Sequence, residues 1–276
     1  MNKISAAITA IGAYVPDYIL SNQLLETMVD TNDEWITTRT GIKERRILKD
    51  KDKGTSYLAI KAAQNLIDKK NINPSEIDMV IVATATPDMM VASTAAFVAT
   101  QVGAKNAFSY DLQAACSSFL YGMSTAASYI ESGRYKKVLL IGADKMSSII
   151  DYEDRTTCII FGDGAGAALF EPNNEGLGFQ DEYLRSDGNG REFLRMDAGG
   201  SLFPASEDTV KNKQHFIWIT IIFSGIKKFI DPGFPTPSVH WYQGTMKLVS
   251  NNNIRISQTG GRHQLSFIRY SLYFSC

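Results

Sequence analysis

Strand-like and helix-like patterns alternate along the first 170 residues of the chain. Met79 to Thr84 and Lys137 to Ala143 are continuous apolar runs, and residues 55–70 carry apolar side chains at the spacing of an amphipathic helix. Apolar runs without polar alternation are typical of strands that are covered on both faces. The pattern therefore predicts an α/β fold with a covered, largely parallel sheet.

Start and stop signals place the other expected elements. Gly12 and Pro16 are expected to end the first strand. Asn32 is expected to cap a helix that Gly41 closes. The remaining expected strands are Ile4 to Ile11, Ala107 to Leu112 and Ala167 to Phe170, and the remaining expected helices start at Ser21 or cover about residues 31–40, 93–103 and 117–133.

The composition is that of an ordinary globular protein. A chain of 276 residues with 44% hydrophobic content can form a sizeable core, as one large domain or two ordinary ones. The net charge of -1 argues against a nucleic-acid-binding protein held mainly by phosphate contacts. The most apolar tail segment, residues 217–225, is well below the ~20 residues of a membrane-spanning helix, so no membrane partner is expected. No signal-peptide pattern is expected at the start of the chain either.

The three cysteines, Cys116, Cys158 and Cys276, are widely spaced and odd in number. They suggest neither a disulfide framework nor a zinc site, and they favour a reducing, cytoplasmic compartment. Cys116 is the informative one, because it follows an expected strand and precedes an expected helix. A helix N-terminus favours the thiolate, which is the form that attacks carbonyl carbon. From position alone, a buried cysteine that packs as a small hydrophobe is an equally good interpretation.

Three motifs in order resemble those of β-ketoacyl-acyl carrier protein synthase III. They are NDEWITTRTGI at residues 32–42, DLQAACSSFLYG at residues 111–122, and Asp154-Arg155 followed by IFGDGAGA at residues 160–167. The resemblance covers about residues 1–215. It implies a thiolase-like fold with αβαβα layers and the condensation that starts type II fatty acid synthesis.

The resemblance also implies roles for individual residues. Cys116 would be the nucleophile that takes an acetyl group from acetyl-CoA. Trp35 and Arg39, four residues apart on an expected helix, would hold the adenine end of CoA together with Arg155. The implied substrate-binding residues are Thr31, Trp35, Arg39, Arg155, Phe161 and Leu194. The implied partners are acetyl-CoA as a substrate, malonyl-acyl carrier protein and a second copy of the chain, with no metal or redox cofactor.

Two further segments have specific interpretations. By resemblance, the loop at residues 87–91, with Met89 and Met90, would cross a homodimer interface; methionines that fill a core are the plainer interpretation. The glycine-rich run at residues 162–166 fails the dinucleotide-binding fingerprint, because its spacing differs and a strand follows it. We interpret this run as tight backbone packing beside the active site.

The pattern changes after residue 216. The histidine and asparagine motifs that the resemblance leads one to expect are absent, and His215, His240 and His263 stand in other sequence settings. Residues 217–276 hold six basic side chains against one acidic side chain. The sequence thus divides into a nucleophile-bearing half at residues 1–170, a connection at residues 171–216 and an atypical basic tail at residues 217–276. Our hypothesis is a truncation or frameshift near residue 217, which translation of the gene in the other frames tests.

Three alternatives remain open from the sequence. The first is another thiolase-fold condensing enzyme, such as a polyketide or hydroxymethylglutaryl-type synthase. The second is a non-catalytic relative that keeps the nucleophile half of the family. The third is a cysteine hydrolase, against which the absence of a recognisable histidine partner for Cys116 argues.

Overall fold

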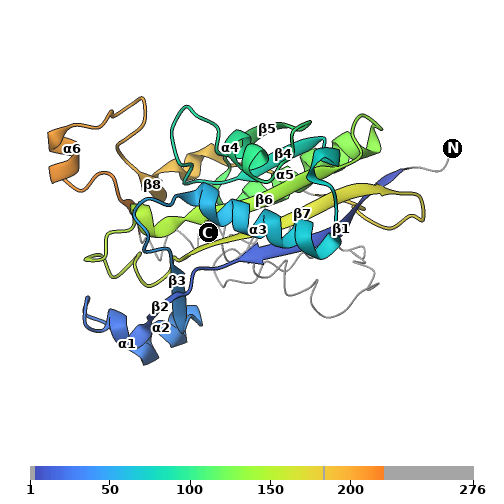
Figure 1. The fold of residues 1–276 in the computed structure, drawn as a ribbon. Helices are drawn as coiled ribbons and strands as arrows, with labels where there is room; N and C mark the ends of the chain where they lie inside the picture. The colour runs from blue at the N-terminus through green and yellow to red at the C-terminus, as the bar shows by residue number, and fades with distance from the viewer. Residues whose placement is uncertain (1–3, 183, 221–276) are drawn as a thin grey trace, which may run out of the picture.

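The computed structural model describes residues 4–182 and 184–220, and its centre is a five-stranded sheet (Figure 1). The strands lie in the order β1-β7-β6-β4-β5. Their bounds are β1 Ser5–Tyr14, β4 Met79–Ala83, β5 Phe108–Leu112, β6 Val138–Lys145 and β7 Asp163–Asn173.

The sheet is mixed, so the prediction of a largely parallel sheet was wrong. Strand β4 is parallel to both β5 and β6, whereas β7 is antiparallel to both β6 and β1. A parallel neighbour needs a crossover connection, which is usually a helix. The segment between β6 and β7 holds only the short 3-10 helix η3, Met146–Ile149, so the chain returns antiparallel beside β6.

Helices cover both faces of the sheet. On one face, α3 (Thr55–Lys70) and α4 (Thr94–Gln101) bury apolar side chains against Val80 and Val82. On the other face, α5 (Ser118–Glu131) packs against Met79 and Ile81. The alternation of side chains along β4 therefore feeds two cores. The described residues supply three of the five layers that the sequence resemblance implies.

Gly12 lies inside β1 and does not end it, contrary to the expectation from the sequence. A Cβ atom at Gly12 would come 2.3 Å from the Ala62 carbonyl oxygen and 2.6 Å from the Leu66 nitrogen, both in α3. The glycine is there because a helix backbone crosses the strand at close range. Strand β7 likewise starts earlier than expected, at Asp163, and includes residues 163–166 of the glycine-rich run.

A smaller unit projects from one end of the sheet (Figure 1). It contains the two-stranded antiparallel sheet β2 (Tyr18–Ser21) and β3 (Glu44–Ile47), with α1 (Asn22–Leu25) and α2 (Asp33–Thr40). Arg45 of β3 is buried, and its Nε atom donates to the Ile159 carbonyl oxygen at 2.9 Å. This bond fastens the unit to the segment that leads into β7.

Residues 174–220 form short elements. They are the 3-10 helix η4 (Gly188–Glu192), the antiparallel pair β8 (Leu194–Met196) and β9 (Ile217–Ile219), and α6 (Glu207–Lys211). The remaining short 3-10 helices are η1 (Pro74–Glu76) and η2 (Ala115–Ser117). Within the described ranges, no helix has the length and apolar character needed to cross a bilayer.

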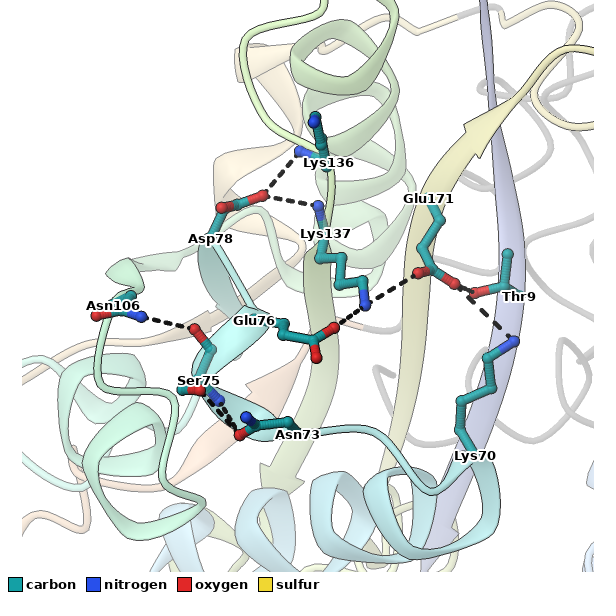
Figure 2. A network of polar contacts seen from close by, with 10 residues as sticks. All are labelled: Thr9, Lys70, Asn73, Ser75, Glu76, Asp78, Asn106, Lys136, Lys137 and Glu171. Carbon is teal, nitrogen blue, oxygen red and sulfur yellow. Dashed lines mark hydrogen bonds and ion pairs between the residues drawn. The ribbon is translucent and has the colours of Figure 1, made fainter.

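A network of hydrogen bonds and ion pairs links neighbouring elements at the amino ends of β4 and β6 (Figure 2). Glu171 of β7 lies 3.6 Å from Lys137 Nζ and 4.0 Å from Lys70 Nζ, and it accepts a hydrogen bond from Thr9 of β1. Asp78 accepts from the Lys137 backbone nitrogen at 2.9 Å. The network joins β1, β7 and α3 to the residues that directly precede β4 and β6, at the end of the sheet opposite the carboxyl end of β5.

Candidate active site

Cys116 lies just beyond the carboxyl end of β5, in the single 3-10 turn η2 that leads into α5. The first residue of α5 is Ser118, so the sulfur sits before the helix and not inside its first turn. The side chain is half-buried. Cys116 thus follows a strand and precedes a helix, as expected, but β5 is the edge strand of the described sheet and not a central one.

The turn around Cys116 has an unusual backbone. Ala115 has a φ of 45°, in the left-handed region. The Ser118 hydroxyl accepts from the Ala114 nitrogen at 2.7 Å and donates to the Ala115 carbonyl oxygen at 2.7 Å. The turn is thus held from the helix side by a side chain that is 1% exposed.

Asp111 holds the same segment from the strand side. Its carboxylate accepts from the backbone nitrogens of Thr94 at 2.8 Å and Ala95 at 2.6 Å, which are the first residues of α4. The Ser93 hydroxyl adds a bond of 3.3 Å. Asp111 therefore ties the strand that carries the nucleophile to the N-terminus of α4, where a carboxylate is also favoured by the helix dipole.

Asp144, at the end of β6, is a buried carboxylate that our sequence analysis missed. One oxygen accepts from Thr84 Oγ1 at 3.0 Å, from the Ala85 nitrogen at 2.8 Å and from both the nitrogen and the hydroxyl of Thr86. Burial raises the pKa of Asp144 to about 6, against the opposing effect of these hydrogen bonds. The available signal was an acidic residue directly after an apolar strand.

Asp163 plays a similar part at the start of β7. Its oxygens accept from the Leu48 nitrogen at 2.8 Å, the Ser147 nitrogen at 2.8 Å and the Ser147 hydroxyl at 2.7 Å. Burial raises the pKa of the Asp163 carboxyl. The preceding Gly162 packs closely on the backbone of Arg46 in β3. The glycine-rich run is therefore tightly packed backbone, as we interpreted it, and it lies at the start of a strand and not at the start of a phosphate-binding helix.

Trp35, Arg39 and Arg155 lie together beside α2. The guanidinium carbon of Arg39 is 4.3 Å from the Trp35 ring centroid, and that of Arg155 is 5.0 Å from it. Arg155 also donates from Nη1 to the Asp30 carbonyl oxygen at 2.8 Å. The structure thus brings together an aromatic plane and two planar cations, which can stack on a purine base and bind phosphates.

Capping fixes the helix that presents this group. The Asn32 side chain accepts from the Trp35 nitrogen at 2.8 Å, and Gly41 ends α2 with a φ of 72°. Both capping residues were predicted from the sequence. Thr31 stands directly before the cap, and its Oγ1 is buried. Within residues 4–182 and 184–220 it is the buried side-chain polar atom without a hydrogen-bond partner.

The other predicted site residues lie in two places. Phe161 is buried, and it belongs to a cluster that includes Ile36 and Cys158 and against which Trp35 packs. Leu194 is 41% exposed and lies on β8, opposite Ile219. His215 Nε2 is 2.9 Å from the Thr209 hydroxyl, an arrangement that ties a short turn together. His240, His263 and Cys276 lie outside the described residues.

Comparison with known proteins gives the family. The family model for 3-oxoacyl-(acyl-carrier-protein) synthase III matches residues 110–188, which hold Cys116. The chain is 58% identical over 217 residues to β-ketoacyl-(acyl-carrier-protein) synthase III 2 of Bacteroides thetaiotaomicron, covering 79% of this chain. It is 59% identical over 216 residues to a synthase III of Chlorobaculum tepidum. The solved synthase III of Thermus thermophilus aligns with a TM-score of 0.70 and 39% identity, covering 81% of this chain and 67% of that one.

The chain belongs to the β-ketoacyl-acyl carrier protein synthase III family.

Its α/β architecture is the thiolase-like fold of these enzymes. The chain spans 65% of the length of the Bacteroides relative and 66% of the Chlorobaculum relative. A priming β-ketosynthase of a polyketide pathway also aligns, with a TM-score of 0.68 and 29% identity. Its fold is about as similar as that of the Thermus synthase III, and its sequence identity to this chain is lower.

Proposed function

We propose that this chain is an acyltransferase half of a synthase III, in which Cys116 accepts an acetyl group from acetyl-CoA. The observation that carries the proposal is the group formed by Trp35, Arg39 and Arg155, which suits a nucleotide, in a chain whose cysteine lies in the turn between β5 and α5. The unpartnered Thr31 hydroxyl beside this group adds support, because a buried polar group without a partner suits a ligand.

The proposed transfer uses the cysteine as a thiolate. The sulfur attacks the thioester carbonyl carbon, the bond from that carbon to the CoA sulfur breaks, and CoA leaves as a thiolate that takes a proton from water. The acetyl group stays on Cys116 as a new thioester. The N–H groups at the start of α5 favour the thiolate before the attack.

The condensation that follows needs groups outside this half. Loss of carbon dioxide from malonyl-acyl carrier protein frees an electron pair that attacks the acetyl carbonyl carbon and releases the Cys116 thiolate with acetoacetyl-acyl carrier protein. The developing enolate oxygen needs hydrogen-bond donors, and the loss of one such donor costs about 10² to 10³ in rate. Because the family's histidine and asparagine motifs are absent from the sequence, we expect this chain to acylate Cys116 but to condense poorly.

A second copy of the chain is the proposed partner at the β5 edge of the sheet. Every residue of β4 is buried, whereas Phe108 at the start of β5 is 39% exposed. Next to β5, α4 and the loop before it expose a group of large apolar side chains. They are Met89, Met90, Val91 and Phe97, with Met90 77% and Val91 97% exposed. An open strand edge beside exposed apolar residues suits a dimer that continues the sheet. We propose the cytoplasm as the compartment, because acyl carrier proteins are found there.

The test is acetyl transfer to the full-length chain. After reduction, the chain is incubated with acetyl-CoA, and mass spectrometry of the Cys116 peptide follows the acetyl thioester. We expect Trp35→Ala to raise the acetyl-CoA concentration for half-maximal transfer about tenfold, because a stacked base contributes ~1–3 kcal/mol. Arg39→Lys is the matched variant, because it keeps the positive charge and removes the planar guanidinium group.

Two outcomes separate the open alternatives. An acetyl group that never reaches Cys116 would favour a non-catalytic relative. Equal transfer from other acyl-CoA donors, with no response to Trp35→Ala, would favour a different condensing enzyme.

A further inference from the structure

The backbone at Ala115 is strained at the residue before the nucleophile. Its φ of 45° is one of three positive values among the non-glycine residues that the structure describes. Another, Asn71, is the left-handed C-cap of α3, a usual place for asparagine. A left-handed conformation is unfavourable for an L-residue, because its Cβ atom comes too close to the following carbonyl oxygen. Such strain persists when the surrounding structure holds it.

One hydroxyl holds Ala115 from both sides. Ser118 Oγ accepts from the Ala114 nitrogen and donates to the Ala115 carbonyl oxygen, each at 2.7 Å. These two groups flank the strained residue along the backbone. Because Ser118 is 1% exposed, water does not compete for either bond.

The bonds of Ser118 differ from those of Thr125 and Ser128 on the same helix. Thr125 and Ser128 donate to the carbonyl oxygens four residues earlier, each at 2.9 Å, as serine and threonine commonly do inside helices. Ser117, the N-cap residue, makes no capping bond with its side chain. The hydroxyl that organises this turn is therefore the one at position 118.

We propose that Ser118 is a positioning residue that keeps the reduced Cys116 reactive by holding Ala115 in its left-handed conformation. Without the hydroxyl, Ala115 relaxes to a negative φ, and the chain direction at Cys116 changes with it. The sulfur then leaves its place before the N-terminus of α5, where the helix field favours the thiolate. This inference rests on the proposed role of Cys116 as the acyl acceptor. It adds the Ser118 hydroxyl as the group that positions the Cys116 sulfur.

The experiment measures alkylation, which needs no acetyl-CoA. The full-length chain and Ser118→Ala are reduced and treated with iodoacetamide across a pH series, and the Cys116 peptide is quantified by mass spectrometry. We expect Ser118→Ala to slow alkylation of Cys116 about tenfold at neutral pH, because the sulfur leaves the helix field that favours the thiolate. The midpoint of the pH profile should move to higher pH.

Two controls separate positioning from loss of fold. Ser128→Ala removes a hydroxyl from the same helix away from the turn, and it should leave the rate unchanged. Cys158 is an internal reporter, because it is fully buried and burial raises its pKa to about 11. Faster labelling of both Cys116 and Cys158 in Ser118→Ala would mean that the hydroxyl holds the fold, and it would overturn the proposal.

A rescue variant tests the mechanism itself. Glycine adopts a positive φ without the Cβ penalty, so Ala115→Gly removes the drive to relax. The double variant Ala115→Gly with Ser118→Ala should therefore recover most of the lost rate. A Ser118→Ala rate equal to wild type, or a double variant as slow as the single one, overturns the proposal. If Ser118→Ala slows alkylation but acetyl-CoA never labels Cys116, the proposed function fails and the positioning role stands.

Discussion

At the scale of single residues, polar groups hold the site together. Asp111, Asp144 and Asp163 each accept several hydrogen bonds from the loops around the carboxyl ends of β5 and β6 and the start of β7. Each carboxylate satisfies backbone nitrogens that would otherwise be buried without a partner. The loops are therefore fixed by specific acceptors, and each acceptor can be tested alone.

Asp144 should give the stability of the chain a specific pH dependence. Its pKa is raised by burial from 3.8 to about 6 in the folded chain, so the folded state holds the proton more tightly than the unfolded state. This contribution to the free energy of unfolding is complete below about pH 4 and is lost as the pH rises through about 6. We expect the advantage of wild type over Asp144→Asn, measured by urea unfolding, to be larger at pH 4 than at pH 7.

Asparagine suits this comparison because it keeps an acceptor oxygen for Thr84, Ala85 and Thr86 while it removes the titration. Asp163 titrates in both chains, so its own raised pKa cancels in the difference. A difference that stays constant between pH 4 and pH 7 would contradict the assignment.

Thr31 should show opposite effects on stability and on binding. Thr31→Val keeps the shape of the side chain and removes a buried hydroxyl that has no partner, so the free energy of unfolding should rise by about 1 kcal/mol. If that hydroxyl meets CoA, the affinity for CoA in a calorimetric titration should fall about fivefold, the value of one such bond.

Thr40→Val is the control at the other end of α2. The Thr40 hydroxyl donates to the Ile36 carbonyl oxygen at 2.8 Å and accepts from the Ile42 nitrogen at 3.0 Å, so its loss should lower stability. Unchanged CoA affinity in Thr31→Val would remove Thr31 from the proposed site.

At the scale of elements, local signals predicted helices well and strand partners poorly. Helix α3 has the predicted bounds, Thr55–Lys70, because its apolar stripe and its ends are local features. The direction of β7 and the role of Gly12 depend on which elements come to lie side by side, and the sequence pattern does not contain that information.

The site divides in the same way. The cap of α2 and the position of Cys116 were predictable from neighbouring residues. The bond from the Leu48 nitrogen to Asp163 joins residues 115 positions apart, and Arg155 meets Trp35 from a distant segment. The Leu48–Asp163 bond had no sequence signal, and the contact of Arg155 with Trp35 was expected through family resemblance alone. Neither follows from periodicity.

The close contact of β1 with α3 should tolerate no side chain at position 12. Gly12→Ala would place a Cβ atom within 2.6 Å of two backbone atoms of α3, and neither atom can move away alone. We expect a loss of about 1–3 kcal/mol or more in the free energy of unfolding. Gly188→Ala, where a Cβ atom meets nothing within 4 Å, should change stability by about 0.5 kcal/mol or less. Equal midpoints in urea for both variants would refute the close contact.

At the scale of the whole molecule, the apolar edge by β5 sets the expected assembly. Val91 is 97% exposed, so Val91→Lys should leave the fold of each copy intact while it places a charge in the proposed dimer interface. Light scattering after size exclusion should then report a dimer for wild type and a monomer for Val91→Lys.

Val210→Lys on α6 is the matched control, because this valine is 65% exposed and lies on a different element. It should remain a dimer. A monomeric wild type, or a Val91→Lys chain that still dimerises, would count against this interface.

The pairing of β1 with β7 also orders events during synthesis. Ser5 pairs with Asn173, and β1 has no other strand beside it in the described sheet. A nascent polypeptide must therefore leave the ribosome as far as residue 165, the partner of Tyr14, before its first strand can begin to pair, and as far as residue 173 before the pairing is complete. Until then the backbone hydrogen-bonding groups of β1 have no strand partner, so the N-terminal segment is an open edge for most of the time in which these residues are made.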